Sequence, residues 1–254
     1  MSAALAVLLT ARDEEEQLPK ALASVAGWAG EVVVVVDPRT TDRTREVARE
    51  AGARVLEHPF SSSAAQCNWG LERCASRWVL VLDADERVTP GLRDEITTAL
   101  AAASGAAFTV RRVNLAFGRA VRFGDWGSDE IVRLFDRTRA RFEERAVHGA
   151  VAGTPVRCLA GALEHDTLRS LAQYLPKLHD YATRGAAALL AEGRRAGPLR
   201  ALLHAEWRFV RSYILRAGFL DGGVGLVVAA LAAYGTFLKW VLAWEAATRR
   251  RPGT

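Results

Sequence analysis

Two acidic residues one position apart, Asp83 and Asp85, directly follow the apolar run at residues 78–82. Carboxylates at this spacing at the end of a strand can share one divalent cation, and hard oxygen ligands suit Mg2+ or Mn2+. Such a cation can also contact a nucleotide diphosphate, so the pair predicts a metal-assisted nucleotide site. The other interpretation of so short a motif is a solvated acidic turn at the beginning of a helix.

Polar residues also end two other apolar runs, with Thr10 closing residues 5–10 and Asp37 closing residues 31–37. Consecutive valines in the second run cannot alternate between core and solvent, so they predict a strand buried on both faces. The alternation of strands and helices predicts an open α/β sheet with right-handed crossovers, in which ligands bind at the carboxyl ends of strands. Further strands are predicted at 54–57 and 78–83, and helices at 14–26 (with acids in its first turn), 41–51, 64–75 and 90–102, the last capped by Thr89.

Composition and missing motifs exclude several classes of protein. The chain has 254 residues, of which 50% are hydrophobic and 25% charged, which argues against disordered, collagen-like and coiled-coil proteins. No G-x-G-x-x-G follows the first strand and no G-x-x-x-x-G-K-[ST] occurs, so neither a classical dinucleotide fold nor a P-loop is indicated. Three cysteines without a metal or disulfide pattern, and an N-terminus without a basic signal-peptide region, favour a cytoplasmic protein.

A net charge of +5 at pH 7 favours anionic partners such as phosphates or acidic lipids. The arginines are spread among acids and no nucleic-acid-binding motif occurs, so nucleic acid is not an expected partner. After residue 105 the pattern changes to strands and loops, and then to helices. Strands are predicted at 108–113 and 131–135, and helices at 168–190 and 199–216.

The segment at residues 217–244 bears on localisation, because residues 222–238 carry no charge. It can be a buried core helix, a single membrane span, or a helix lying at the membrane surface. Its glycines weaken a span, whereas Trp240 and Trp244 suit the headgroup level and the arginines at 249–251 suit anionic lipid. We therefore expect a peripheral element on the inner face of the cytoplasmic membrane, although the same arginines also fit a solvated tail.

An ordered set of short motifs resembles the family 2 glycosyltransferases, and more closely their lipopolysaccharide-core branch, which is similar to β-glucosyltransferases acting on a Kdo-containing acceptor. No single motif is specific, but their order and spacing are, and the resemblance covers nearly the whole chain. The motifs are Leu9-Thr10-Ala-Arg-Asp13-Glu14-Glu15, Val36-Asp37-Pro-Arg-Thr40-Thr-Asp42-Arg-Thr44, Gln66-Cys-Asn68, Leu82-Asp83-Ala-Asp85-Glu86, Arg133-Leu-Phe135, Val147-His148, Glu164-His165 and residues 213–226.

The resemblance implies a GT-A fold, an open mixed sheet flanked by helices that binds a nucleotide sugar, with a C-terminal helical extension. It implies a catalytic domain at 1–165 and a helical, membrane-associated extension at 166–254. The cofactor would be Mg2+ or Mn2+ and the donor a nucleoside-diphosphate sugar, with a UDP-sugar as the first expectation. By resemblance, the nucleoside pocket would be lined by Thr10, Arg12 and Asp37, the ribose and metal-bound diphosphate would face Asp83 and Asp85, and the sugar nucleotide would lie near Gln66 and Asn68.

Two histidines and an arginine follow in the same set of motifs. His148 is expected as a further metal ligand or a diphosphate contact, and a structural role stays open for it. Arg133 is expected to pair with the diphosphate, the alternative being a salt bridge at a strand edge. His165 has the same alternatives as Arg133.

Inversion at the anomeric carbon needs a general base opposite the leaving diphosphate. Asp129 is favoured because it lies just upstream of the Arg133 motif, and Asp125 is the second candidate; a surface turn whose acids pair with arginines is the alternative. Gly149 follows His148 where the branch usually has Glu, which leaves the identity of the base open.

Two further departures concern the donor. Asp13 stands for the usual Asn, and Pro38-Arg39 stands for Ser-Gly, which leaves the nucleobase open. The resulting prediction is an inverting glycosyltransferase that acts on a membrane-linked glycan or lipid acceptor of the cell envelope. The alternatives are a polyprenyl-phosphate glycosyltransferase, and a non-catalytic nucleotide-sugar-binding protein.

Overall fold

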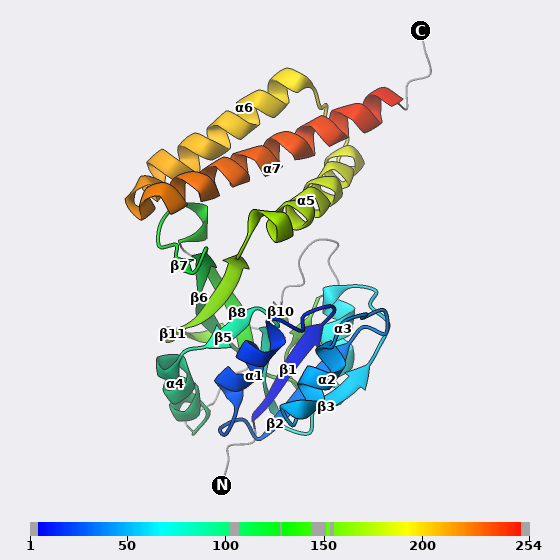
Figure 1. Ribbon diagram of the computed structural model, residues 1–254, viewed down its shortest axis with the longest axis vertical. Helices are drawn as coiled ribbons and strands as arrows, with labels where there is room; N and C mark the ends of the chain where they lie inside the picture. Colours follow the sequence, from blue (N-terminus) through cyan, green and yellow to red (C-terminus); the bar gives the residue numbers. More distant parts are fainter. Residues whose placement is uncertain (1–4, 102–106, 128, 144–150, 153–154, 250–254) are drawn as a thin grey trace. The chain divides into compact units, whose positions relative to one another are not determined.

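The computed structural model describes residues 5–101, 107–127, 129–143, 151–152 and 155–249. The chain forms two compact units (Figure 1), which are described separately. The first comprises Met1–Arg112 and Asp129–His165, and the second comprises Val113–Ser128 and Asp166–Thr254. Residues 113–128, expected in the catalytic domain, therefore belong to the helical unit, and Asp125 goes with them.

The first unit is built on a mixed sheet, as the α/β prediction requires. The strand order is β3-β2-β1-β4-β8-β6-β11-β5, with β3, β2, β1 and β4 parallel. Strand β8 is antiparallel to β4 and to β6, and β11 is antiparallel to β5. The strands are β1 (Leu5–Ala11), β2 (Glu31–Val36), β3 (Arg54–Glu57), β4 (Trp78–Asp83), β5 (Glu86–Val88), β6 (Ala107–Ala116), β7 (Arg119–Ala120), β8 (Asp129–Asp136), β9 (Arg141–Phe142), β10 (Val151–Ala152) and β11 (Pro155–Leu168).

Helices cover both faces of the parallel strands, which confirms the prediction made from the valine run. On one face Val34 and Val36 pack with apolar residues of α1 (Leu18–Val25), α2 (Thr44–Glu50) and α4 (Pro90–Ala101). On the other face Val33 and Val35 pack with α3 (Ser63–Leu71). Burying both faces removes this part of the sheet from water and fixes the positions of the strand ends.

Helix α1 begins at Leu18, four residues later than predicted, after a turn at residues 15–17. The Glu14 N–H donates to Thr44 Oγ1 over 2.8 Å, and the Glu15 N–H donates to Asp42 Oδ2 over 2.9 Å. These backbone donors thus join the segment before α1 to the segment after β2. The predicted cap of α4 is confirmed, since the Leu92 N–H donates to Thr89 Oγ1 over 3.3 Å.

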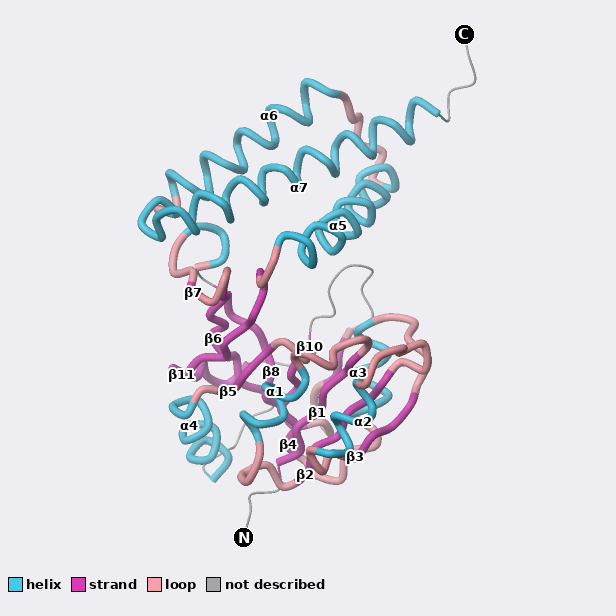
Figure 2. Tube along the Cα trace, in the orientation of Figure 1, coloured by secondary structure: helices cyan, strands magenta, loops and turns pink. Residues whose placement is uncertain are grey.

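The second unit is mainly helical, as Figure 2 shows. Helix α7 packs against both α5 and α6, and their shared core includes Ala186, Ala201 and Ala243. The predicted helix at 199–216 is divided, because its last residues form a π-helical segment. The elements are η1 (Gly124–Trp126), α5 (Leu171–Ala191), α6 (Pro198–Phe209), the π-helix η2 (Val210–Leu215), the 3-10 helix η3 (Gly218–Asp221) and α7 (Gly222–Arg249).

The apolar segment forms α7, which together with η3 is long and apolar enough to cross a membrane by length and composition only, with a mean hydropathy of 1.8 over its best window. Core helices meet the same criterion. The placement of Trp240 at a headgroup level is wrong, because its side chain is 3% exposed and stacks on His204 with ring centroids 4.2 Å apart. Trp244 is 41% exposed.

The packing of β11 on α4 gives a test of the fold in the first unit. A Cβ atom at Gly161 would lie 2.5 Å from the Cα and 2.7 Å from the backbone N of Leu92. These are backbone atoms that cannot rotate away, so Gly161→Ala should lower the free energy of unfolding by about 1–3 kcal/mol. Gly91→Ala is the matched control on α4: its Cβ meets nothing within 4 Å, and it should be neutral or stabilising. Urea unfolding measures both, and equal midpoints for the two variants would contradict this packing.

Candidate functional site

Polar side chains from three strands meet at the carboxyl edge of the parallel sheet. The β1–β4 register places Thr10 beside Asp83. The Asp37 N–H donates to the carbonyl oxygen of Ala11 over 3.1 Å, which places Asp37 at the same edge after β2. The prediction that these groups converge is therefore confirmed, and this is the edge where open α/β sheets bind ligands.

A buried carboxylate, Glu86, lies at the centre of this edge and is 0% exposed. Its Oε1 accepts from Arg133 Nη2 over 2.7 Å and from Arg112 Nη1 over 3.2 Å. Its Oε2 accepts from the Asp83 N–H over 3.1 Å. Burial raises the pKa of Glu86, and the positive charge of Arg133 opposes that rise.

The two arginines extend the network from Glu86 to both candidate functional acids. Arg133 also donates to Asp83 Oδ2. Arg112 donates to Asp129 Oδ2 through Nε over 2.8 Å and through Nη2 over 2.5 Å. Burial disfavours the charged form of Arg133, but the carboxylates of Asp83 and Glu86 outweigh it and raise the arginine's pKa. Arg133 therefore belongs to an internal ion-pair network, and its contact with the diphosphate stays a prediction.

Asp85 lies on the other side of the same turn and faces a histidine. Its Oδ1 is 3.4 Å from His165 Nε2, and the side chains are 20% and 15% exposed. The contact depends on β5, which directly follows the acidic turn and pairs with β11 so that His165 lies opposite Glu86. Sequence reasoning missed β5, because a strand of three residues after an acidic turn carries no periodic pattern.

Asp83 and Asp85 carry the hard carboxylate oxygens that suit a divalent cation at this edge, and His165 lies against Asp85. Among the residues that the structure describes, no group of three or more His, Cys, Asp or Glu side chains is gathered to hold a metal ion. A preformed cage is not required for Mg2+ or Mn2+, which commonly take one or two carboxylates and complete their shell with phosphate oxygens and water. The Asp83 side chain is 46% exposed, so it is open to such a ligand. His148 and Gly149 lie outside the described residues.

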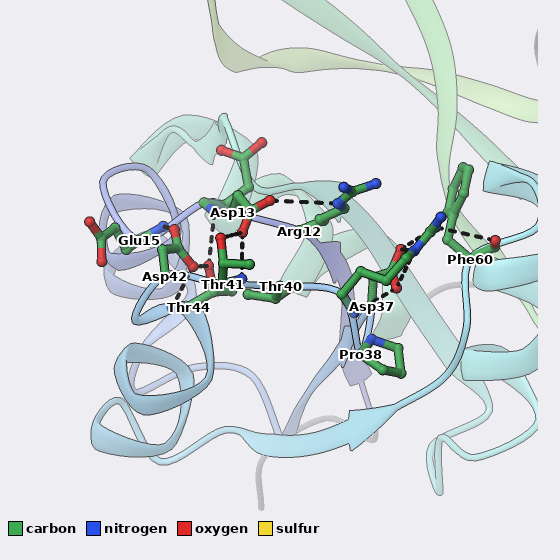
Figure 3. Close-up of polar contacts among 12 residues, drawn as sticks. Arg12, Asp13, Glu15, Asp37, Pro38, Thr40, Thr41, Asp42, Thr44 and Phe60 are labelled. Carbon is green, nitrogen blue, oxygen red and sulfur yellow. Dashed lines mark hydrogen bonds and ion pairs between the residues drawn. The ribbon is translucent and has the colours of Figure 1, made fainter.

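Asp37 (Figure 3), which is expected to face the nucleoside, is 2% exposed, and Arg39 binds its carboxylate. Arg39 donates through Nη2 to Oδ2 over 2.6 Å, through Nε to both oxygens over 3.1 Å, and through its backbone N–H to Oδ1 over 3.0 Å. The side-chain hydrogen bond from Arg39 is the main cause that lowers the pKa of Asp37 to about 2. A nucleoside that binds this carboxylate must share it with Arg39 or displace the guanidinium.

The loops after β1 and β2 bind each other beside Asp37 (Figure 3). Asp13 Oδ1 accepts from the Thr41 N–H over 2.8 Å, and Asp13 itself has a positive φ of 54°. Asp tolerates this left-handed conformation better than most residues, so Asp13 serves this turn. Arg12 lies 3.5 Å from Asp13, between Nε and Oδ2, with half of its side chain exposed. It is thus available at the rim of the edge.

The two predicted amides hold neighbouring segments in place. Gln66 donates through Nε2 to the His58 carbonyl over 3.0 Å, and its Oε1 lies 2.9 Å from His58 Nδ1. Asn68 donates to the Phe142 carbonyl over 2.9 Å and accepts from the Phe142 N–H over 3.0 Å. Both amide groups therefore fix the chain at His58 and at β9, and their contact with a sugar nucleotide stays a prediction.

Asp125 lies in the helical unit and has a different environment. Its side chain is 4% exposed, and its oxygens contact Arg208 Nε at 2.7 Å, Arg211 Nη2 at 2.9 Å and Arg216 Nη1 at 2.8 Å. Three guanidinium groups thus surround this carboxylate, and Arg211 and Arg216 donate hydrogen bonds to its Oδ1. We therefore do not propose Asp125 as the base, and this position corresponds to the ion-paired alternative.

Residues 6–154 match the family model of glycosyl transferase family 2, which covers more than half of the chain. The edge described above lies within the matched residues, apart from His165. The chain belongs to glycosyl transferase family 2.

Curated relatives extend the likeness over nearly the whole chain. An uncharacterised glycosyltransferase of Rickettsia typhi is 25% identical over 251 residues, 92% of this chain and 85% of the relative. The lipopolysaccharide core biosynthesis glycosyltransferase LpsC of Rhizobium meliloti is 25% identical over 245 residues, 90% of each chain. Among solved structures, S. aureus TarS aligns with a TM-score of 0.48 at 11% identity, over 98% of this chain and 93% of that chain. Membership of the family rests on the family model.

The buried network predicts a large effect of removing its central carboxylate. Glu86→Ala leaves Arg133 and Arg112 without their shared counter-charge, so the free energy of unfolding should fall by about 3–5 kcal/mol. Asp94→Ala is the matched control, because Asp94 is 70% exposed and its pair with Arg93 should contribute less than about 1 kcal/mol. Urea unfolding compares the two, and a loss in Glu86→Ala no larger than in the control would contradict the role of the network.

The Asp37–Arg39 pair predicts a pH effect. Because the pKa of Asp37 in the folded protein, about 2, lies below its ordinary 3.8, the pair adds stability above about pH 4 that is lost as the pH falls through 2. In Arg39→Ala the pKa of Asp37 should rise, so less stability is lost between these pH values. Carboxyl-carbon NMR titration and acid unfolding measure both effects, with the exposed Arg49→Ala as control. An Asp37 pKa that stays near 2 in Arg39→Ala would contradict the assignment to Arg39.

Proposed function

We propose that this protein is an inverting glycosyltransferase that moves a sugar from a nucleoside-diphosphate sugar to a lipid-linked glycan of the cell envelope. The observation that carries the proposal is the carboxyl edge, where Thr10, Asp37 and Asp83 from three strands lie beside the Asp85–His165 pair. Family membership supports the transfer chemistry. The similarity to a relative named for lipopolysaccharide core biosynthesis supports an envelope glycan as acceptor.

The donor nucleotide would bind along this edge. Asp37 and Thr10 would contact the nucleoside, with Arg12 at the rim, while Asp83 would accept from a ribose hydroxyl. Arg39 supplies hydrogen-bond donors beside Asp37, so the base would present acceptor atoms to the guanidinium. Uracil has two such carbonyl oxygens, and a UDP-sugar remains our proposal for the donor.

Asp83 and Asp85 would hold a divalent cation, which would neutralise the charge that develops on the leaving diphosphate. The two acids contact different side chains of the protein. Arg133 donates a hydrogen bond to Asp83, and His165 faces Asp85. Thus the two carboxylates of the acidic turn have different partners, and each is fixed before the donor binds.

Asp129 would act as the general base. Arg112 donates its hydrogen bonds to Oδ2, and among the described residues no hydrogen bond is made to Oδ1, which could therefore accept the proton of an acceptor hydroxyl. In the reaction the acceptor oxygen would form a bond to the anomeric carbon while the bond to the diphosphate breaks, and the hydroxyl proton would go to Asp129. Direct displacement of this kind inverts the anomeric carbon without a covalent enzyme intermediate.

We propose that the enzyme works at the inner face of the cytoplasmic membrane, where a lipid-linked acceptor is presented. The basic, partly apolar helical unit and the lipopolysaccharide relative support this placement. A polyprenyl phosphate as acceptor needs no strong base, so a transfer assay with that acceptor distinguishes it from a hydroxyl acceptor.

The site is tested by calorimetric titration with UDP, GDP and ADP, with and without Mn2+. We expect one nucleotide to bind more tightly with Mn2+ than without it. In Asp83→Asn and Asp85→Asn this gain in affinity from Mn2+ should be lost, whereas Asp94→Asn, which changes an exposed acid on α4, is the matched control and should keep it. Asp129→Asn should keep donor binding but lower transfer by about 10²–10⁴-fold, whereas Glu130→Gln should change neither. Unchanged metal dependence in both Asp83→Asn and Asp85→Asn would overturn the proposal.

A further inference from the structure

Large apolar side chains are concentrated on one exposed part of the helical unit. Of 17 exposed large hydrophobic residues in the described part of the chain, eight fall between Pro198 and Asp221. Helix α7 has only three, although it is longer. We call this set the α6 surface; it consists of Leu199, Leu202, Leu203, Trp207, Ile214, Leu215, Phe219 and Leu220, each 49–68% exposed.

Helix α6 is amphipathic, and its large apolar side chains face solvent. Leu199, Leu203 and Trp207 are spaced four residues apart, so they lie on one face of the helix. On the other side, Ala201 is 0% exposed and His204 stacks on Trp240 of α7. The core contact of α6 is thus made by small and polar groups, while its apolar stripe has no partner in the described structure. An exposed patch of this kind marks an interaction surface.

Three arginines alternate along the chain with residues of the α6 surface and share one counter-ion. Arg208, Arg211 and Arg216 all contact the carboxylate of Asp125 within 2.9 Å. Asp125 offsets one of the three positive charges, which leaves two on neighbouring guanidinium groups. The arginine side chains are 36–45% exposed, so solvent and ligands reach them. A second anion would relieve their mutual repulsion, and guanidinium groups bind phosphate well.

We propose that the α6 surface docks on an anionic phospholipid bilayer, with its apolar side chains in the interfacial region and Arg208, Arg211 and Arg216 bound to lipid phosphates. The proposal rests on the membrane placement in the proposed function and assigns it to a surface. Charge complementarity selects the bilayer as occupant, because an apolar face bordered by arginines matches an anionic headgroup layer. Trp207 adds an aromatic ring of the kind enriched at the headgroup level. The sequence pattern had placed the membrane contact on the segment that forms α7, whereas this proposal places it on the α6 surface.

Vesicle flotation tests the arginines. The protein is mixed with phosphatidylcholine vesicles, with or without phosphatidylglycerol, and binding should require the anionic lipid and weaken with salt. Arg211→Gln/Arg216→Gln keeps the Arg208–Asp125 pair, and its affinity should fall by about fivefold for each arginine, or about 25-fold in total. Arg49→Gln/Arg93→Gln removes the same charge from exposed positions of the first unit and should leave the affinity within about twofold. Circular dichroism establishes that all variants are folded.

Brominated lipids test which helix inserts, because they quench the fluorescence of a tryptophan that enters the bilayer. Quenching should be lost in Trp207→Phe and kept in Trp244→Phe, the exposed tryptophan of α7. The reverse result, or equal vesicle binding by the arginine double variant and the parent, would overturn the proposal. So would light scattering that shows a dimer which Leu203→Ser dissociates, since a second copy would then cover the surface. Nucleotide titration of the same variants separates failure of this proposal from failure of the donor site.

Discussion

A carboxylate without access to water stays charged only beside positive groups, and the arrangement of the candidate site depends on how this condition is met at Glu86. Arg133 and Arg112 both bind Glu86, and each also binds an acid with a proposed role, Asp83 or Asp129. The buried group thereby sets the positions of the proposed donor-binding acid and the proposed base through two rigid guanidinium planes. Because these residues come from β4, β5, β6 and β8, the same network also joins the parallel and antiparallel parts of the sheet.

The nucleoside side of the edge follows a different principle, in which a departure from the family pattern has a local consequence. Arg39 forms a bidentate pair with Asp37 and lowers its pKa to about 2, so the carboxylate is ionised near neutral pH. The Asp37 carboxylate is therefore charged, but both of its oxygens already accept hydrogen bonds from Arg39. In the proposed donor site, selection of the nucleoside would therefore depend on the Asp37–Arg39 pair as a unit and not on Asp37 alone.

The helical unit also contains a cluster of arginines and carboxylates, but there the arginines outnumber the carboxylates. At Glu86 two arginines serve three carboxylates, whereas at Asp125 one carboxylate serves three arginines. The first arrangement leaves negative charge at an edge suited to a cation, and the second leaves positive charge beside an apolar surface. We infer that the two units meet different ligands, a metal-bound diphosphate in one case and lipid phosphates in the other.

The sequence by itself determined the α/β class, the positions of the parallel strands and the convergence of Thr10, Asp37 and Asp83, because period and strand-end polarity are local properties of the chain. It also indicated the family through ordered motifs. Only the tertiary structure decided that Arg133 is an internal ion-pair partner, that Asp125 lies among arginines of a different unit and that Trp240 is buried against His204. These outcomes depend on contacts between residues 36 to 91 positions apart, and no local pattern encodes which distant charge or ring a side chain will meet.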